Sequence, residues 1–141
     1  MDIQLGRLAM AYRTAVVRRL GEHEDFAEWG LRPPSMGTLK VIAHSGPISQ
    51  REVSERLGVH PSDMVKVVDQ LEEYGLVSRV RAEGDRRRYD LTLTPKGERM
   101  LERFTALTRE VDQDFYAVLS AAEQRQLEKL MGKLVSGHFA R

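Results

Sequence analysis

Cysteine is absent from all 141 positions of the sequence, and this absence excludes several classes of protein at once. Disulfide-stabilised domains, zinc sites with thiolate ligands, iron–sulfur proteins, enzymes with a cysteine nucleophile and thiol-based redox sensors all require that side chain. Long apolar runs are missing too, so the sequence offers neither a membrane-spanning helix nor the apolar core of a secretory signal. We therefore expect a protein of the reducing cytoplasm with no membrane partner.

An excess of one charge is also missing, because 22 Lys and Arg residues oppose 21 Asp and Glu residues. The net charge of +1 does not argue against a nucleic-acid partner, since such proteins can gather their basic residues in one local patch. A composition of 41% hydrophobic and 30% charged residues is typical of a globular protein. At this length one core can form without a metal or a disulfide.

Signatures of catalysis are absent as well. The sequence contains no G-x-S-x-G, G-x-x-x-x-G-K or H-E-x-x-H motif, so we expect no enzymatic activity and no cofactor. The histidines are scattered, and no two have the i, i+4 spacing of a helical metal site: His23, His44, His60 and His138. We predict no metal site, although His23 with Glu22, Glu24 and Asp25 leaves one local group open.

Apolar residues at helical spacing predict helices at both ends of the chain. The first stripe consists of Leu5, Leu8, Ala9, Tyr12, Val16 and Leu20, and Gly21 ends that helix. After the break at Pro33-Pro34, Ser35 is expected to cap a short helix. Thr94-Pro95 is expected to start a long helix whose stripe is Met100, Phe104, Leu107, Val111, Phe115 and Val118. Ser120 and Glu123 form a capping box before a final helix.

The middle of the chain predicts a helix-turn-helix. Ser49 and Glu52 form a capping box at the start of a first short helix, and Gly58 suits the left-handed residue of a tight turn. Pro61 stands in the first turn of the second helix, where it costs no hydrogen bond. The inward residues of the second helix are Met64, Val67, Val68 and Leu71. Two short helices joined by a glycine turn are the signature of this motif.

A basic hairpin is expected directly after the helix-turn-helix. Residues 77–81 and 89–93 alternate apolar and polar side chains, and Glu83-Gly84-Asp85 between them provides a turn. We call this hairpin the wing. Two acids there face a larger number of arginines, namely Arg79, Arg81, Arg86, Arg87 and Arg88. Arginines at a hairpin tip can enter the narrow minor groove of DNA, although a charged hairpin can also be a merely solvated surface.

The second helix of the motif has polar residues in its first turns, where such helices reach base edges. Lys66 can donate to guanine, Asp63 can accept from cytosine, and Ser62 suits a phosphate. Asp63 has the alternative of serving only the helix dipole. His60 is an N-cap substitute, a phosphate donor or a surface residue. Farther along, Asp69 and Glu72 are interpreted as structural or solvated.

The segment VHPSDMVKVVDQLEEYGLVSRVRAEGDRRRYDLTLTPKG resembles the recognition helix and wing of the multiple-antibiotic-resistance regulator (MarR) family. The resemblance rests on the D-x-L-E-x-x-G-L-V-x-R run that begins at Asp69 and on Asp85-Arg86-Arg87, which leads into Leu91, Leu93-Thr94 and Gly97. It extends over essentially the whole chain. It implies that Asp85 supports Arg87 in the minor groove. It also implies a homodimer that binds pseudo-palindromic operators and is often released by small anionic aromatic ligands.

We therefore predict a mainly α-helical fold with a small β-wing. A winged helix-turn-helix at residues 34–94 is flanked by an N-terminal dimerisation helix and linker at 1–33 and by C-terminal dimerisation helices at 95–141. Because the flanking helices have little of the small winged unit to cover, their apolar faces are expected to pack against a second chain. The predicted function is that of a sequence-specific regulator of transcription, a repressor that binds double-stranded DNA and is released by a small ligand.

Two sets of site residues follow from this prediction. The predicted DNA-binding residues are His60, Ser62, Asp63, Lys66, Arg79, Arg86 and Arg87, with Asp85 supporting Arg87. The predicted ligand-binding residues are Tyr12, Trp29, His44 and Phe104. The alternative function is a winged-helix module for protein–protein contact that lacks specific DNA binding.

Overall fold

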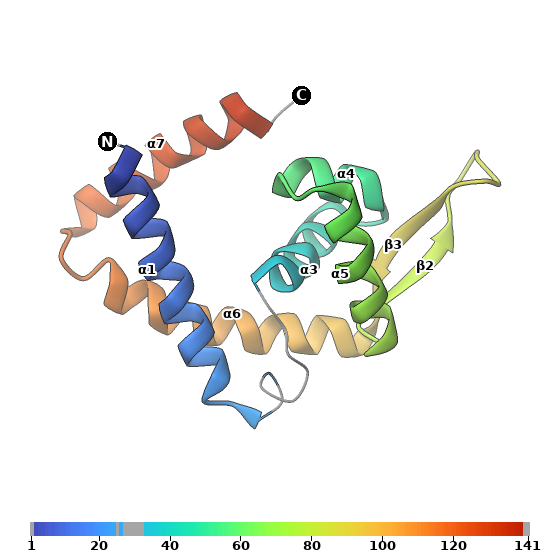
Figure 1. Cartoon of the computed structure of the whole chain (residues 1–141), viewed down its shortest axis with the longest axis horizontal. Coiled ribbons are helices and arrows are strands. Elements are labelled where there is room, and N and C mark those ends of the chain that lie inside the picture. The colour runs from blue at the N-terminus through green and yellow to red at the C-terminus, as the bar shows by residue number, and fades with distance from the viewer. Residues whose placement is uncertain (1, 25, 27–32, 140–141) are drawn as a thin grey trace. The chain divides into compact units, whose positions relative to one another are not determined.

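The structure is a computed structural model that describes residues 2–24, 26 and 33–139. Its elements are α1 (Asp2–Gly21), α3 (Pro33–Ser45), β1 (Ile48–Ser49), α4 (Gln50–Leu57), α5 (Pro61–Glu73), β2 (Val77–Arg81), β3 (Tyr89–Leu93), α6 (Pro95–Phe115) and α7 (Ala121–Phe139) (Figure 1). The prediction of a mainly helical fold with a small sheet is confirmed. Among the described residues, no helix is both long and apolar enough to cross a membrane.

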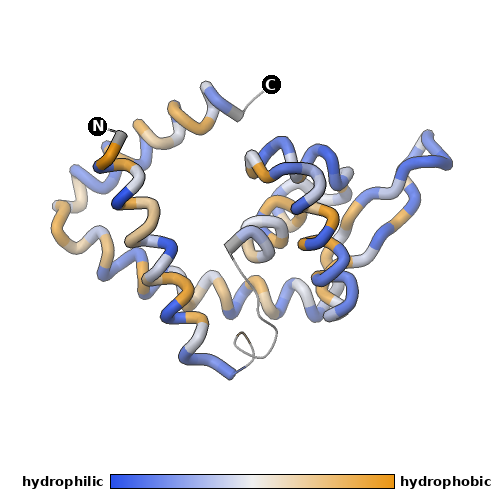
Figure 2. Tube along the Cα trace, in the orientation of Figure 1, coloured by the Kyte–Doolittle hydropathy of each residue, from blue (hydrophilic) through white to orange (hydrophobic). Residues whose placement is uncertain are grey.

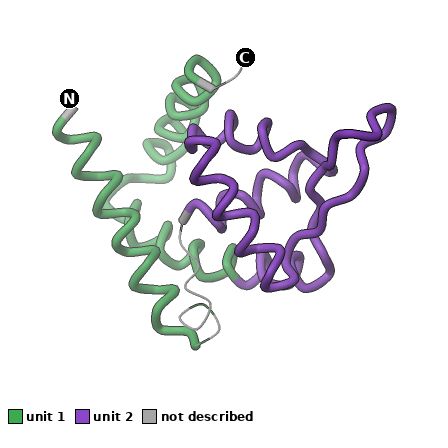
Figure 3. The backbone as a smooth tube through the Cα atoms, turned by 45° about the vertical axis from the view of Figure 1, so that its right-hand side comes forward, with its two compact units in different colours: residues 1–33, 104–141 green, residues 34–103 purple. Residues whose placement is uncertain are grey.

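The chain divides into two compact units (Figure 3). Residues 1–33 and 104–141 form the first, which we call the helical unit, and residues 34–103 form the second, which we call the winged unit. Because α6 begins at Pro95 and ends at Phe115, its first turns belong to the winged unit and its remainder to the helical unit.

In the helical unit, polar and aromatic contacts hold α1 against the second half of α6. The Tyr12 hydroxyl donates to Asp112 Oδ1 at 2.7 Å, and the Tyr12 ring meets the Phe115 ring edge to face at 5.3 Å. One turn after Val16, the Arg19 guanidinium forms an ion pair with Glu110. Val16 and Val111 are buried. The predicted helical stripe of α1 is thus used for packing in its second half.

The connection from α6 to α7 contains both a confirmed and a wrong prediction. Glu123 accepts the Ser120 N–H at 2.8 Å, and Ser120 Oγ accepts the Glu123 N–H at 3.3 Å, so the predicted capping box is present. Hydrogen bonding of the Glu123 carboxylate to the backbone N–H of Ser120, and to its side chain, lowers the pKa of Glu123. The apolar stripe of α6 was expected to reach Val118, but the helix ends at Phe115 and Val118 is 88% exposed. The chain turns there through hydrogen bonds such as Leu119 N–H to the Tyr116 carbonyl.

The winged unit packs three helices and a small sheet around one apolar core. Fully buried side chains come from every layer of it: Met36, Leu39, Ile42, Val53, Met64, Val68, Leu71, Leu76, Val77 and Leu91. The expected cap at Ser35 is wrong, because α3 already begins at Pro33 and Ser35 is buried inside it. Prolines in the first helical turn need no N–H partner, which allows the helix to start there.

The helix-turn-helix forms by the local interactions that its sequence predicts. Ser49 Oγ accepts the Glu52 N–H at 3.2 Å at the start of α4. Gly58 closes α4 with a left-handed φ of 63°, a conformation that glycine adopts without strain. Pro61 then opens α5 in its first turn. A short turn, whose backbone conformation is set by Gly58 and Pro61, therefore positions α5 against α4.

The sheet has three antiparallel strands in the order β1-β3-β2. The predicted hairpin pairs Val77 with Leu93 at its base and Arg81 with Tyr89 toward its tip. Sequence patterning missed β1, because two residues are too few to show an alternation; Ile48 pairs with Leu91 across it. β1 thus anchors the wing to the start of α4.

One backbone junction joins the end of α5, the predicted recognition helix, to the wing and to α6. The carbonyl of the buried Leu76 accepts the Thr94 N–H at 3.1 Å, and Thr94 Oγ1 accepts the Gly97 N–H at 3.0 Å. A Cβ atom on Gly97 would lie 2.0 Å from the Leu76 carbonyl oxygen. Only glycine allows this approach of two backbones.

We expect Gly97→Ala to lower the free energy of unfolding by about 3 kcal/mol, because the methyl group meets a fixed backbone carbonyl inside a packed core. Gly137→Ala is the matched control, since nothing lies within 4 Å of its added Cβ. The control should be unchanged or up to about 1 kcal/mol more stable, as alanine favours helix. Urea unfolding of both variants measures this, and equal stabilities would contradict the close approach.

Candidate nucleic-acid interface

The exposed side of α5 carries the polar residues that the sequence analysis singled out. Met64, Val68 and Leu71 are fully buried and fix the inner side of the helix. Ser62, Asp63 and Lys66 are all exposed in its first two turns. The structure therefore brings these predicted residues together at the N-terminal end of one helix.

His60 has the first of the roles considered for it, that of N-cap. Its Nδ1 accepts the Ser62 N–H at 3.2 Å and lies 2.7 Å from the Ser62 hydroxyl. An Nδ1 that accepts a hydrogen bond leaves the proton of the neutral ring on Nε2. The imidazole thus orders the first turn of α5 and holds the Ser62 side chain in place.

The tip of the wing is braced through its backbone. Asp85 Oδ1 accepts the backbone N–H of Arg87 at 2.9 Å, an Asx-type turn that a carboxylate or an amide oxygen can make. Gly84 adopts a left-handed φ of 79° beside it, and the Ala82 N–H closes the hairpin on the Arg88 carbonyl at 2.9 Å. Arg86 and Arg87 are exposed. This hydrogen bond to the backbone of Arg87 is a contact through which Asp85 can support Arg87. The support of a DNA-binding Arg87 stays a prediction.

Two other wing arginines are held by partners on the hairpin itself. Arg88 Nε lies 3.3 Å from Asp90 Oδ1, whose side chain is only 11% exposed. The Arg81 guanidinium lies over the Tyr89 ring at 5.9 Å, on the strand position directly opposite. Both contacts stiffen the strands behind the tip.

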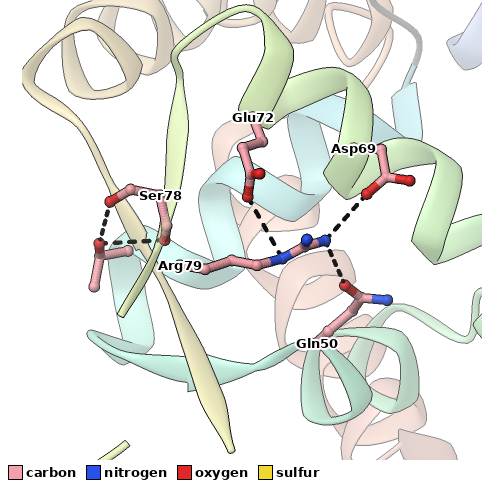
Figure 4. Close-up of polar contacts among 6 residues, drawn as sticks. Gln50, Asp69, Glu72, Ser78 and Arg79 are labelled. Atoms are coloured by element: carbon pink, nitrogen blue, oxygen red, sulfur yellow. Dashed lines mark hydrogen bonds and ion pairs between the residues drawn. The ribbon is translucent and has the colours of Figure 1, made fainter. Parts of the chain in front are cut away.

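Arg79, which we predicted to contact DNA, forms a clamp inside the winged unit (Figure 4). Its Nη2 lies 3.1 Å from Asp69 Oδ1, and its Nε lies 3.5 Å from Glu72 Oε2. The same Nη2 donates to Gln50 Oε1 at 3.4 Å. This guanidinium therefore connects β2 to α4 and α5. It also places one positive charge beside two carboxylates of α5. A DNA contact by Arg79 stays a prediction.

The clamp was missed although its members share one motif. Asp69, Glu72 and Arg79 all belong to the D-x-L-E-x-x-G-L-V-x-R run. The two acids were interpreted as structural or solvated and Arg79 as a DNA contact, so a pairing among the three was not predicted. Acids three residues apart lie on one helix face, and this spacing was the available signal. Gln50 gave no signal, because it is far from Arg79 in the sequence.

The predicted ligand residues that the structure describes are divided between the two units. Tyr12 and Phe104 belong to the helical unit and His44 to the winged unit, while Trp29 lies outside the described residues. Burial and the hydrogen bond to Asp112 raise the pKa of Tyr12. A cavity of about 480 Å³ in the helical unit has a different lining: Ala15, Arg18, Arg19, Glu22, Glu110, Val111, Asp114 and Phe115. The ligand residues stay a prediction.

The residues that the structure describes contain no cluster of three or more His, Asp or Glu side chains able to hold a metal ion. Of the local group left open in the sequence, Glu22, His23 and Glu24 are described and Asp25 lies outside the described residues.

Comparison with known proteins identifies the family. A sequence model of the MarR family matches residues 29–88. Over 135 residues, 96% of each chain, the sequence is 30% identical to the HTH-type transcriptional repressor Rv2887 of Mycobacterium tuberculosis. The chain belongs to the MarR family. A putative transcriptional regulatory protein for the hcr operon of Thauera aromatica is 43% identical over 105 residues, which are 74% of this chain but only 63% of that protein.

Solved structures of MarR-family protein Rv2887 have the same fold. Its complex with DNA matches with a TM-score of 0.74 at 26% identity, over 95% of this chain and 96% of that one. Its complex with salicylic acid matches with a TM-score of 0.73 at 28% identity, over 95% of both chains. The similarity to this MarR-family protein thus extends beyond the winged unit to nearly the whole chain.

We expect the Arg79–Asp69 pair to contribute a coupling free energy of about 1 kcal/mol, the upper end for a partly exposed pair, because it belongs to a network of four residues. The pair Arg51–Glu55 on α4 is the matched control: it is more exposed and lies within one helix. Its coupling should be about 0.3 kcal/mol. Double-mutant cycles to alanine, followed by urea unfolding, measure both couplings. A coupling no larger for the Arg79 pair than for the control would contradict the clamp.

Proposed function

We propose that this MarR-family protein is a homodimeric repressor of transcription that binds a pseudo-palindromic DNA operator and releases it when a small ligand binds. The observation that carries the proposal is the presence of an exposed polar helix start and an exposed basic wing tip in one compact unit. The capped start of α5 exposes Ser62 and Lys66, and the braced wing tip exposes Arg86 and Arg87. No step of this function needs a catalytic residue, and we propose that the protein is not an enzyme.

The recognition helix supplies the base contacts of this proposal. Ser62 and Lys66 are four residues apart and share one face of α5, so both reach the same groove. Lys66 donates to guanine O6 or N7, and Asp63 accepts from cytosine N4. Ser62 contacts a phosphate near the N-terminus of α5, where the helix dipole also favours an anion. Its hydroxyl proton turns from His60 Nδ1 to the phosphate when DNA binds.

The wing supplies the second contact. Arg87 enters the narrow minor groove beside the site that α5 reads, where the negative potential is strongest. Because Asp85 accepts from the backbone of Arg87, the guanidinium keeps its hydrogen-bond donors for the DNA. Arg79 places one positive charge beside Asp69 and Glu72 on α5, which reduces the repulsion between these carboxylates and the phosphates.

Dimerisation follows from large apolar side chains that a single chain leaves exposed. Hydrophobic residues, orange in Figure 2, recur along both α1 and α7. Leu5 is 68% exposed on the first half of α1, and Leu134 is 60% exposed on α7. The same two helices also expose Leu8, Met10, Leu130, Met131 and Val135. Apolar surface of this extent at the chain ends marks an interaction site, and a two-fold axis through these helices covers both copies at once.

A ligand acts by favouring a dimer in which the two winged units are wrongly spaced for successive grooves. DNA and ligand then weaken each other by the same factor, as linkage requires. The complex of the relative Rv2887 with salicylic acid supports a small anionic aromatic compound as the ligand class.

Selection from a random DNA pool at near-physiological salt tests the function. We expect a two-fold-symmetric sequence bound at least about a thousandfold more tightly than its scrambled version. Inserting about 5 bp between the half-sites should abolish tight binding, because it places them on opposite sides of the duplex. Binding that is weak and indifferent to sequence would contradict the proposal, and no binding would favour a protein–protein module.

We expect Arg87→Ala to weaken operator binding by about 1–3 kcal/mol, the range for one groove contact. Asp85→Ala should also weaken binding, since it removes the brace. Asp85→Asn should bind at least as tightly as the native protein, because its amide oxygen accepts the same N–H and one negative charge near the DNA is removed. Fluorescence anisotropy with labelled operator measures the three variants. Equal weakening by Asn and Ala would refute the backbone brace.

A further inference from the structure

Val65 is an apolar side chain in the middle of the polar face of α5. It is 45% exposed, whereas its neighbours Met64 and Val68 are fully buried. Within α5, all of whose residues the structure describes, it is the one large hydrophobic residue that is exposed. Valine is a poor choice for stability at such a position, because a β-branched side chain has low helix propensity and its apolar surface stays in water.

The neighbours of Val65 on the helix surface place it inside the predicted DNA-contacting face. Ser62 precedes it by three residues, Lys66 follows directly, and Asp69 lies four residues on. The Asp69 carboxylate, four residues on from Val65, is paired with the Arg79 guanidinium at 3.1 Å. Val65 therefore lies between a phosphate donor and a base-reading cation, on a face with no other large apolar group.

Valine has neither a donor nor an acceptor in its side chain, so it can recognise only one feature of a base edge. The major groove presents a single apolar group, the C5-methyl group of thymine. Contact with that methyl group removes the apolar surfaces of both partners from water. A guanine, adenine or cytosine at the same place would leave polar atoms against the isopropyl group.

We propose that Val65 is a specificity-determining residue that reads one thymine in each half-site through its C5-methyl group. This inference rests on the proposed function, since it assigns a base to the face of α5 that binds the operator. It adds a contact that the charged residues cannot provide. Lys66 and Asp63 select G and C, and Val65 adds a preference for T at a neighbouring position.

Replacement of thymine by deoxyuridine tests this contact directly, because it deletes only the methyl group and leaves base pairing and polar edges unchanged. Each thymine of one half-site of the selected operator is replaced in turn, and affinities are measured by fluorescence anisotropy. At one position the native protein should bind about fourfold more weakly, the fold-change expected for losing one buried methyl group.

The Val65→Ala variant decides whether Val65 is responsible. It should bind the thymine and deoxyuridine operators equally at that position, while the matched control Lys66→Ala should retain the fourfold difference. Alanine at an exposed helix position favours the fold, and thermal unfolding of the variant verifies this.

The outcomes separate this inference from the function on which it rests. If the native protein binds its operator tightly but no thymine is sensitive, or if the sensitivity persists in Val65→Ala, the role of Val65 is refuted and the repressor function stands. If no specific operator is found at all, both the proposed function and the inference about Val65 are refuted.

Discussion

The buried carbonyl of Leu76 is the point on which the arrangement of the winged unit depends. It accepts the Thr94 N–H and lies so close to Gly97 that no side chain fits between them. The end of α5, the base of the wing and the first turn of α6 are therefore fixed to one another by backbone atoms. This junction therefore sets the distance between exposed side chains on α5, such as Lys66, and exposed side chains on the wing, such as Arg87.

Charge compensation is the second constraint on the surface. The recognition helix carries acids toward its C-terminal end, where they would repel phosphates, and the Arg79 guanidinium binds both Asp69 and Glu72. Such partly exposed ion pairs contribute modestly to stability. Their larger effect is on the electrostatic potential of α5, because they offset negative charge toward its C-terminal end. The wing repeats this pattern, with Arg88 held by Asp90 and Arg87 left exposed.

Local features of both units were predictable because interactions between residues close in the sequence decide them. Gly58 takes a left-handed φ, Pro61 opens α5, and Ser120 with Glu123 forms a complete capping box, all within a few residues of sequence. Predictions failed where a local rule met a competing one. Ser35 has a good capping side chain, yet Pro33 starts the helix two residues earlier, and the apolar spacing ran on to Val118 although the chain had already turned.

The sequence by itself determined the helix-turn-helix, the basic wing and the membership of the MarR family, because hydrophobic periodicity, caps and turn residues act over short distances. Only the tertiary structure decided which charged side chains form ion pairs and which stay exposed. Arg79 and Arg87 were both predicted to contact DNA, but packing brings Gln50, Asp69 and Glu72 to the side chain of Arg79, while Arg87 is held by its backbone. Likewise, the predicted inward stripe of α5 leaves Val65 out, but only the structure shows that this side chain is 45% exposed among polar neighbours. Partners distant in the sequence meet only after the chain has folded, so no local pattern can name them.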